Sequence, residues 1–212
     1  MDVVLDFILT HISSFDHDVL LFVNRSMRSA FFDQIMPYIT KLGDAGIFWI
    51  ALALILLIPK KTRRTGAAMG VAMVIGLIIG NGLLKNVIAR TRPFDIAHPV
   101  VPRNSLLINP PTDYSFPSGH TLASFEAATA LFKDHTVYGF GAFVLALLIA
   151  FSRIYLQVHY PSDVIGGAIL GFLFGLLGST IVRSVCDGWA ARKAKKEAEL
   201  AAGEKKSEES SN

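Results

Sequence analysis

The sequence has few charged residues and almost no cysteine. Of its 212 residues, 17% are charged and 52% are hydrophobic, whereas a soluble domain carries about a quarter charged residues. Cys186 is the single cysteine, which excludes an internal disulfide and a thiolate metal cluster. The N-terminus lacks a basic segment followed by a small-residue cleavage site, so we expect no cleavable signal peptide. The composition therefore predicts a membrane protein whose own apolar segments direct insertion.

The apolar residues gather in long runs. Four runs carry no charge, and helices of their length cover most of a hydrocarbon core of about 30 Å. A fifth run is apolar except for His120 and Glu126. The sequence therefore predicts an all-α integral-membrane helical bundle with five to six transmembrane helices. The five runs are Ala45 to Pro59, Thr65 to Leu84, Gly119 to Phe132, Thr136 to Ser152 and Val164 to Val182.

The two ends of the chain differ from this core, which we place at residues 42–190. Charges interrupt the apolar positions of residues 1–41, which are interpreted either as amphipathic interfacial helices or as a first span. Residues 191–212 are predicted to be a charged cytoplasmic tail, a frayed helix that passes into disorder. Glycines repeat every four residues inside two runs, which favours close helix packing within the chain. The same spacing is also compatible with a homodimer, so the oligomeric state stays open.

Basic residues indicate the orientation in the membrane. The short loop Lys60–Arg64 and the segment after the last run are rich in lysine and arginine, which predicts that both are cytoplasmic. The loop at residues 85–118 and the turn at 153–162 then lie on the outer side. The net charge of +3 is explained by this signal, so we expect contacts with membrane lipids and none with nucleic acid. Four basic residues of the outer loop need another explanation: Lys85, Arg90, Arg92 and Arg103.

Two polar clusters flank the outer loop. Lys85 and Arg92 are seven residues apart, so they share one face if the helix continues past Leu84. Two such cations could simply reach lipid headgroups. Ser118 and Gly119 open the next predicted span, with His120 in its first turn. A helix N-terminus offers free N–H groups and a positive dipole end to an anion, although any capped helix start has this pattern.

A third cluster contains Arg153, His159 and Asp163. Asp163 follows His159 by four residues, close enough for its carboxylate to bind one imidazole N–H. This arrangement leaves the other ring nitrogen nucleophilic and stabilises a positively charged ring. A lone histidine near a membrane surface is usually structural, but this one has an aspartate behind it and a second histidine, His120, in another cluster.

Together the three clusters supply the parts of a phosphoryl transfer. The cations Lys85, Arg92 and Arg153, with backbone donors at Ser118–His120, can neutralise a phosphoryl group. His159 is the candidate nucleophile and His120 the candidate acid. No grouping of Asp, Glu and His offers the open coordination position of a catalytic zinc, so we expect neither metal nor cofactor.

These motifs resemble those of a known family. Lys-x6-Arg-Pro, Pro-Ser-Gly-His and Ser-Arg-x5-His-x3-Asp are similar to the three signatures of the type 2 phosphatidic acid phosphatase family, and they cover residues 85–163. The resemblance implies a phosphohistidine on His159, orientation of this ring by Asp163, and protonation of the leaving group by His120. It further implies a phosphate site made by Lys85, Arg92, Ser118, Gly119 and Arg153.

The resemblance also implies a substrate class. The membrane-bound branch of the family hydrolyses a lipid phosphate or diphosphate, and we expect the reaction at the outer face of a prokaryotic plasma membrane. Undecaprenyl diphosphate is slightly favoured over phosphatidylglycerophosphate or phosphatidate, by family analogy alone. Three alternatives are a lipid phosphotransferase, a vanadate haloperoxidase, which the apolar spans argue against, and a non-catalytic anion-binding protein. The sequence leaves the roles of Arg90 and Glu126 open.

Overall fold

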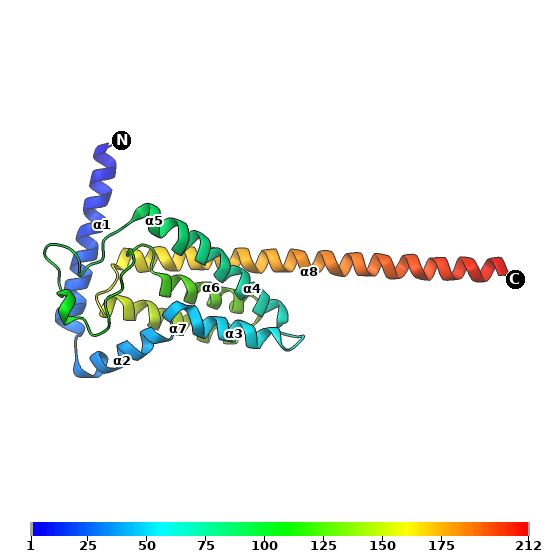
Figure 1. Cartoon of the computed structure of the whole chain (residues 1–212), viewed down its shortest axis with the longest axis horizontal. Coiled ribbons are helices and arrows are strands. Elements are labelled where there is room, and N and C mark those ends of the chain that lie inside the picture. The colour runs from blue at the N-terminus through cyan, green and yellow to red at the C-terminus, as the bar shows by residue number, and fades with distance from the viewer. Residues whose placement is uncertain (1, 212) are drawn as a thin grey trace.

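The computed structural model of the chain describes residues 2–211, with side chains for residues 10–200. The regular elements in this range are all helices, and a long loop connects α5 to α6 (Figure 1). The all-α prediction is confirmed. The α-helices are α1 Asp2–Phe22, α2 Ala30–Lys41, α3 Ile47–Leu57, α4 Arg63–Ile75, α5 Lys85–Ile88, α6 Gly119–Asp134, α7 Thr136–Tyr155 and α8 Pro161–Ser211. Shorter 3-10 or π-helical elements are η1 Val23–Met27, η2 Asp44–Gly46, η3 Gly76–Leu84 and η4 Arg103–Ser105.

The bundle is built around α6. This helix packs against α7 and α8, while α4 packs against α8 and α3. The bundle core contains Trp49, Met69, Ala127 and Ile149, all buried. These side chains come from α3, α4, α6 and α7, so the apolar core joins segments that lie far apart in the sequence.

Glycines let α8 approach its neighbours closely. A Cβ atom on Gly171 would lie 2.6 Å from the backbone oxygen of Leu122 in α6. A Cβ atom on Gly178 would lie 2.8 Å from the backbone oxygen of Ala68 in α4. Real Cβ atoms essentially never come that close to another heavy atom. The small-residue pattern of the last run is therefore used for packing within the chain, as predicted.

Several helices are long and apolar enough to cross a membrane. In the described part of the chain, three qualify, and a bent pair formed by residues 30–41 and 44–57 makes a fourth if it counts as one span. The three are Arg63–Ile88, Thr136–Tyr155 and Pro161–Leu200. α6 has 16 residues and does not reach this length. The membrane-bundle prediction is confirmed, while the predicted number of five to six spans stays a prediction.

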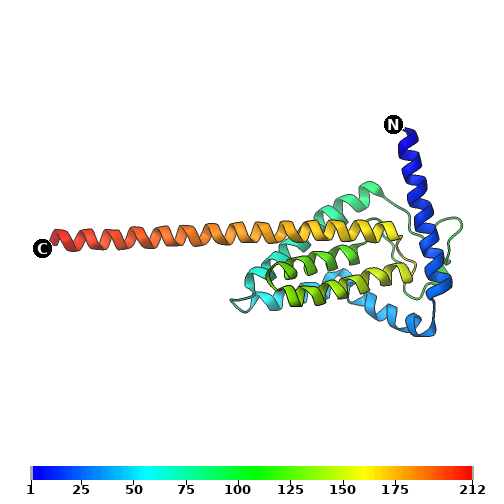
Figure 2. The same ribbon diagram turned by 180° about the vertical axis from the view of Figure 1, so that it is seen from behind.

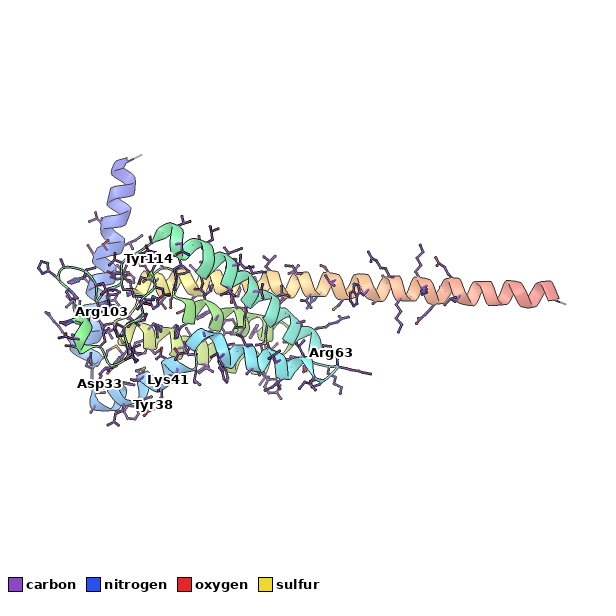
Figure 3. The ribbon with its side chains drawn as sticks, in the orientation of Figure 1. Asp33, Tyr38, Lys41, Arg63, Arg103 and Tyr114 are labelled. Carbon is purple, nitrogen blue, oxygen red and sulfur yellow. The ribbon has the colours of Figure 1, made fainter. Side chains whose placement is uncertain are left out.

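The two ends of the bundle are chemically different. Arg63, in the short basic turn between α3 and α4, lies at the opposite end from Arg103 and Tyr114 of the long loop (Figure 3). At the long-loop end, α1 runs crosswise to α8 in both views (Figures 1 and 2). A crosswise helix suits the interfacial interpretation of residues 1–41, which stays a prediction beside the alternative of a first span.

The end of α8 continues as a helix beyond the last apolar run, and the expected passage into disorder stays a prediction. The backbone is helical through Ser211 (Figure 2). Ala, Lys and Glu dominate residues 191–206 and are strong helix formers. Two ion pairs at four-residue spacing support the same helix, Lys193–Glu197 at 3.7 Å and Lys195–Glu199 at 3.8 Å.

Candidate active site

The helix that carries Lys85 ends earlier than the sequence suggested. α5 stops at Ile88, and Ala89 adopts a left-handed conformation with φ of 47°. Arg92 therefore lies in the following loop, and the prediction that it shares one helical face with Lys85 is wrong. The loop nevertheless brings its guanidinium beside Lys85, since both side chains line the same cavity and contact the same carboxylate.

That carboxylate belongs to Asp113, near the end of the long loop. Its two oxygens pair with the Lys85 ammonium and with Arg92 Nη2, the latter at 2.7 Å. Arg92 Nε also donates to the backbone oxygen of Asp113 at 2.7 Å. Burial raises the pKa of the Asp113 carboxyl, but Lys85 and Arg92 more than offset this effect and hold it below its usual value. The negative charge of Asp113 therefore lies beside Lys85 and Arg92, two cations that the sequence predicts to bind a phosphate.

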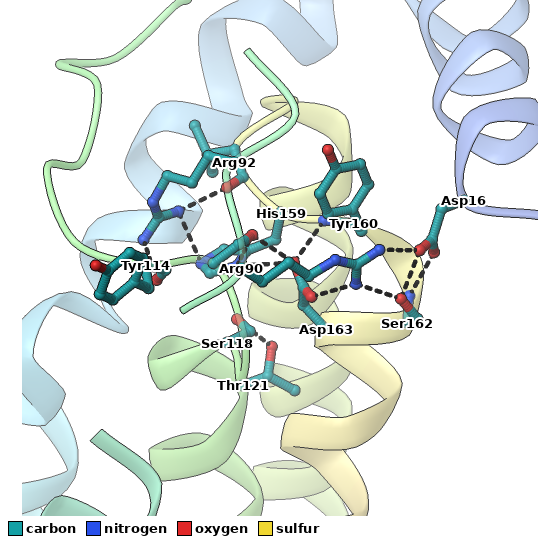
Figure 4. A network of polar contacts seen from close by, with 12 residues as sticks. Asp16, Arg90, Arg92, Tyr114, Ser118, Thr121, His159, Tyr160, Ser162 and Asp163 are labelled. Carbon is teal, nitrogen blue, oxygen red and sulfur yellow. Dashed lines mark hydrogen bonds and ion pairs between the residues drawn. The ribbon is translucent and has the colours of Figure 1, made fainter. Parts of the chain in front are cut away.

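His159 lies behind these cations and is almost completely buried. Its Nε2 is 3.2 Å from Arg92 Nη1, and its Nδ1 is 3.5 Å from Ser115 Oγ (Figure 4). An Nε2 atom that accepts from Arg92 leaves the ring proton on Nδ1. Burial, followed by the positive charges of Arg92, Arg153 and Lys85, lowers the pKa of His159 well below its ordinary value. The free site therefore holds a neutral imidazole whose Nε2 faces the cations.

Asp163 lies on the opposite side of this imidazole, at the start of α8. Its Oδ2 is 3.6 Å from His159 Nδ1, close enough for an ion pair but longer than a hydrogen bond. The same oxygen accepts hydrogen bonds from Ser115 Oγ and from the Tyr160 N–H. The spacing correctly predicted that Asp163 comes next to the imidazole, but in this state its side chain accepts hydrogen bonds from Ser115, Tyr160 and Arg90 instead.

The turn before α8 presents the histidine. α7 ends at Tyr155, and Gln157 is left-handed with φ of 59°, which reverses the chain. α8 then begins at Pro161, the first-turn position that proline favours. His159 is held between two helix ends rather than on a flexible loop.

Ser118, Gly119 and His120 form the start of α6. Ser118 occupies the cap position, but its hydroxyl accepts from Thr121 Oγ1 at 3.0 Å instead of capping a backbone N–H. A Cβ atom at Gly119 would lie 3.0 Å from Asn81 Oδ1, so this position is confined. His120 Nε2 is 2.8 Å from Asp44 Oδ1. Gly119 and His120 line the same cavity as His159.

Arg153 completes the cationic group from the end of α7. It is buried, and its Nη1 donates to Thr40 Oγ1 at 2.6 Å. Its Nε has no hydrogen-bond partner among the residues whose side chains the structure describes. A buried guanidinium with an unused N–H is suited to an added acceptor such as a phosphate oxygen.

A cavity of about 1100 Å³ connects this polar end to the apolar interior. Its far part is lined by Ile50 and Leu54 of α3 and by Val71 and Val74 of α4. Ile50, Leu54 and Val74 are also solvent-exposed, so the apolar part of the cavity is open to the surroundings on the side of these two helices. The space therefore joins a cationic end to an apolar side opening.

Glu126 is a buried acid in the wall of this cavity. It is 1% exposed, and its Oε1 has no hydrogen-bond partner in the structure. No ion pair involves Glu126 among the described residues. The structure therefore favours the interpretation that this residue lines the cavity.

Among the residues that sequence reasoning missed are four that contact the predicted site or Arg90 beside it. They are Asp16, Asp44, Asp113 and Ser115, which contact Arg90, His120, the Lys85–Arg92 pair and Asp163 respectively. Each comes from a segment outside the three motifs and has no diagnostic spacing. One signal in the sequence could have indicated the aspartates. The outer loop has an excess of positive charge, and such charges are commonly paired with nearby carboxylates.

Comparison with known proteins gives a consistent family. The PAP2 superfamily model matches residues 65–185. An undecaprenyl-diphosphatase of Sulfolobus acidocaldarius is 36% identical over 148 residues, which cover 69% of each chain. The undecaprenyl-diphosphatase BcrC of Bacillus subtilis is 32% identical over 152 residues, which cover 72% of this chain and 76% of the relative.

A solved structure has the same architecture. The crystal structure of a transmembrane PAP2-type phosphatidylglycerolphosphate phosphatase from Bacillus subtilis superposes with a TM-score of 0.62 at 27% identity. The alignment covers 84% of this chain and 87% of that one.

The match and the shared architecture define a membrane phosphatase fold. This chain belongs to the PAP2 superfamily, and the family predicted from the three motifs is confirmed.

Proposed function

We propose that the chain hydrolyses a polyprenyl diphosphate such as undecaprenyl diphosphate, through a phosphohistidine on His159, at the outer face of the plasma membrane. The family and the names of the relatives directly support the more general activity, hydrolysis of a lipid phosphate. The observation that carries the proposal is the single cavity that joins the cationic end to an apolar side opening. A lipid phosphate has the same division into a polyanionic head and a hydrocarbon tail.

The phosphoryl group is placed by the cations. Lys85, Arg92 and Arg153 bind its oxygens, with the backbone N–H groups of Gly119 and His120 at the start of α6 on the adjoining side, whereas the Ser118 N–H donates to the backbone oxygen of Asp163. Substrate must displace the Asp113 carboxylate, which pairs with Lys85 and Arg92 in the free protein. Positive charge fixed in a water-poor pocket stabilises the charge that develops on the transferring group.

The first chemical step forms a nitrogen–phosphorus bond. His159 Nε2 attacks the terminal phosphorus, and the bond from phosphorus to the leaving oxygen breaks. His120 protonates that oxygen when it is an alkoxide. A diphosphate instead releases a lipid monophosphate, which needs less help from an acid. Asp163 balances the positive ring that the attack creates, as carboxylates behind catalytic histidines do.

The second step regenerates the enzyme. Water attacks the phosphohistidine, the nitrogen–phosphorus bond breaks, and inorganic phosphate leaves. His120 then acts as the base that removes a proton from this water, since the residue that gave a proton in the first step can take one in the second.

The test is phosphate release from purified protein in detergent, with His159→Ala and an exposed control, His98→Ala. His159→Ala should abolish turnover and trapping of the phosphoenzyme, and His98→Ala should keep both. Near-normal activity of His159→Ala would refute the mechanism. A panel of isoprenoid diphosphates and glycerolipid phosphates then identifies the lipid, and preference for a glycerolipid would overturn the polyprenyl assignment.

A glycerolipid phosphate is the second candidate substrate, favoured by the superposition on the phosphatidylglycerolphosphate phosphatase. Phosphotransfer is a second reaction class, because another lipid or sugar could replace water in the second step. Product analysis with candidate acceptors separates the two reactions, since transfer gives a new phosphorylated product instead of inorganic phosphate.

A further inference from the structure

A second polar network lies behind His159, away from the cations of the phosphate site. Its centre is Arg90, which the three motifs do not include. Arg90 Nη1 donates to Asp163 Oδ1 at 2.6 Å and to Ser162 Oγ at 2.7 Å (Figure 4). Its Nη2 donates to Asp16 Oδ2 at 2.6 Å. One guanidinium thus joins two carboxylates that are 147 residues apart (163 − 16).

Asp16 connects this network to the N-terminal helix. It lies on α1, and its side chain is 1% exposed. Its Oδ1 accepts the Ser162 N–H at 2.8 Å, and its Oδ2 accepts from Ser162 Oγ at 2.6 Å. A carboxylate buried to this degree is costly unless it is paired and hydrogen-bonded. Asp16 is paired with Arg90 and also satisfies a free N–H in the first turn of α8.

Arg90 is itself held firmly in place. Its guanidinium carbon lies 4.0 Å from the centroid of the Tyr160 ring, and its backbone oxygen accepts the Ser115 N–H at 2.8 Å. Ser115 in turn donates its hydroxyl to Asp163 Oδ2. The side chain of Arg90 therefore binds one oxygen of Asp163, and its backbone positions the donor that binds the other.

The contacts of Asp163 determine what it can do for His159. Arg90 occupies Oδ1, while Ser115 and the Tyr160 N–H occupy Oδ2. A carboxylate with both oxygens bound cannot rotate freely. The carboxylate held in this way faces His159 Nδ1 at 3.6 Å, which favours a proton on that nitrogen while Nε2 attacks.

We propose that Arg90, braced by Asp16 of α1, is a positioning residue that fixes Asp163 behind His159. The proposal rests on the assignment of His159 and Asp163 made above. A direct role in substrate binding is the competing explanation, but Arg90 does not line the cavity that Lys85, Arg92 and Arg153 share. The two explanations make opposite predictions about kcat and KM.

The first test replaces the guanidinium with a neutral group of similar reach. Arg90→Gln should lower kcat roughly 10- to 100-fold, the cost of small displacements of catalytic groups, and leave KM within about threefold. Arg103→Gln is the matched control, because Arg103 lies in the same loop and forms one exposed ion pair with Asp95 at 2.6 Å. It should keep both constants.

Two further measurements separate positioning from general loss of structure. Free guanidinium at millimolar concentration should restore part of the activity of Arg90→Ala but not that of His159→Ala. Arg90→Gln combined with Asp163→Asn should be no more than about twofold slower than Asp163→Asn alone, because residues that act through one another are not additive. If Arg90→Gln fails to fold, Asp16→Asn replaces it in the test. This variant should also lower kcat and leave KM unchanged.

The outcomes that overturn the proposal are distinct. A raised KM with unchanged kcat would make Arg90 a substrate ligand, and unchanged constants in both Arg90→Gln and Asp16→Asn would leave the network without a function. A fully multiplicative double variant would show that Arg90 does not act through Asp163. Normal activity in His159→Ala would instead remove the proposed function itself, so the two failures are distinguishable.

Discussion

The pairing of Asp113 with Lys85 and Arg92 gives a quantitative prediction for Asp113→Asn. An anion that enters the site must displace this carboxylate, so removing its charge should tighten anion binding. The Asp113 side chain is 53% exposed, and solvent screening reduces the value of its two ion pairs. We expect the two ion pairs together to contribute about 1–2 kcal/mol. This value lies between that of an exposed ion pair and that of a buried hydrogen bond to a charged group. The variant should therefore bind orthovanadate, a mimic of five-coordinate phosphorus, roughly 5- to 30-fold more tightly.

The assay is inhibition of phosphate release by orthovanadate at fixed ionic strength. Asn keeps the size of the side chain and the backbone oxygen that Arg92 Nε contacts, so the change isolates charge. Asp95→Asn is the control, since Asp95 lies in the same loop and pairs with Arg103 outside the site. An unchanged or higher inhibition constant in Asp113→Asn would refute the view that this carboxylate competes with the substrate.

Three other predictions concern the same site. Asp163→Asn should keep the protein folded in detergent but lower kcat by about two to four orders of magnitude, and a loss below tenfold would argue against a role beside the imidazole. The pKa of His159 lies below its ordinary value of 6.5, so the neutral nucleophile persists as the pH falls. The loss of kcat/KM on the acidic side should therefore occur below pH 6.5, and a loss that sets in at or above pH 7 would contradict this. Activity should survive prolonged incubation with EDTA, since Lys85, Arg92 and Arg153 supply the positive charge, and loss that added metal restores would count against that assignment.

Much of the site was predictable because its residues stand at helix ends with fixed spacing. His159 and Asp163 are separated by one short turn, and the proline between them begins α8. Ser118 and Gly119 begin α6 in the same way. Local sequence determines such placements, so they can be inferred without knowledge of the tertiary fold.

The rest depends on contacts between distant segments. Ser115 and Asp113 reach the site because the long loop folds back over it, and no periodic pattern indicates that path. Asp16 meets Ser162 across 146 residues. The early end of α5 depends on Ala89, a non-glycine residue in a left-handed conformation, which sequence preference argues against. Hydropathy correctly identified the apolar runs as helices, while the number of membrane crossings that they form stays a prediction.

The contact between α1 and α8 also bears on where the functional unit begins. The conserved-domain match starts at residue 65, yet Asp16 binds the first turn of α8 and the arginine beside Asp163. A recombinant fragment trimmed to the matched region would lose this contact and leave the Ser162 N–H without its acceptor. The contacts around Asp163 therefore extend beyond the segment that identifies the family.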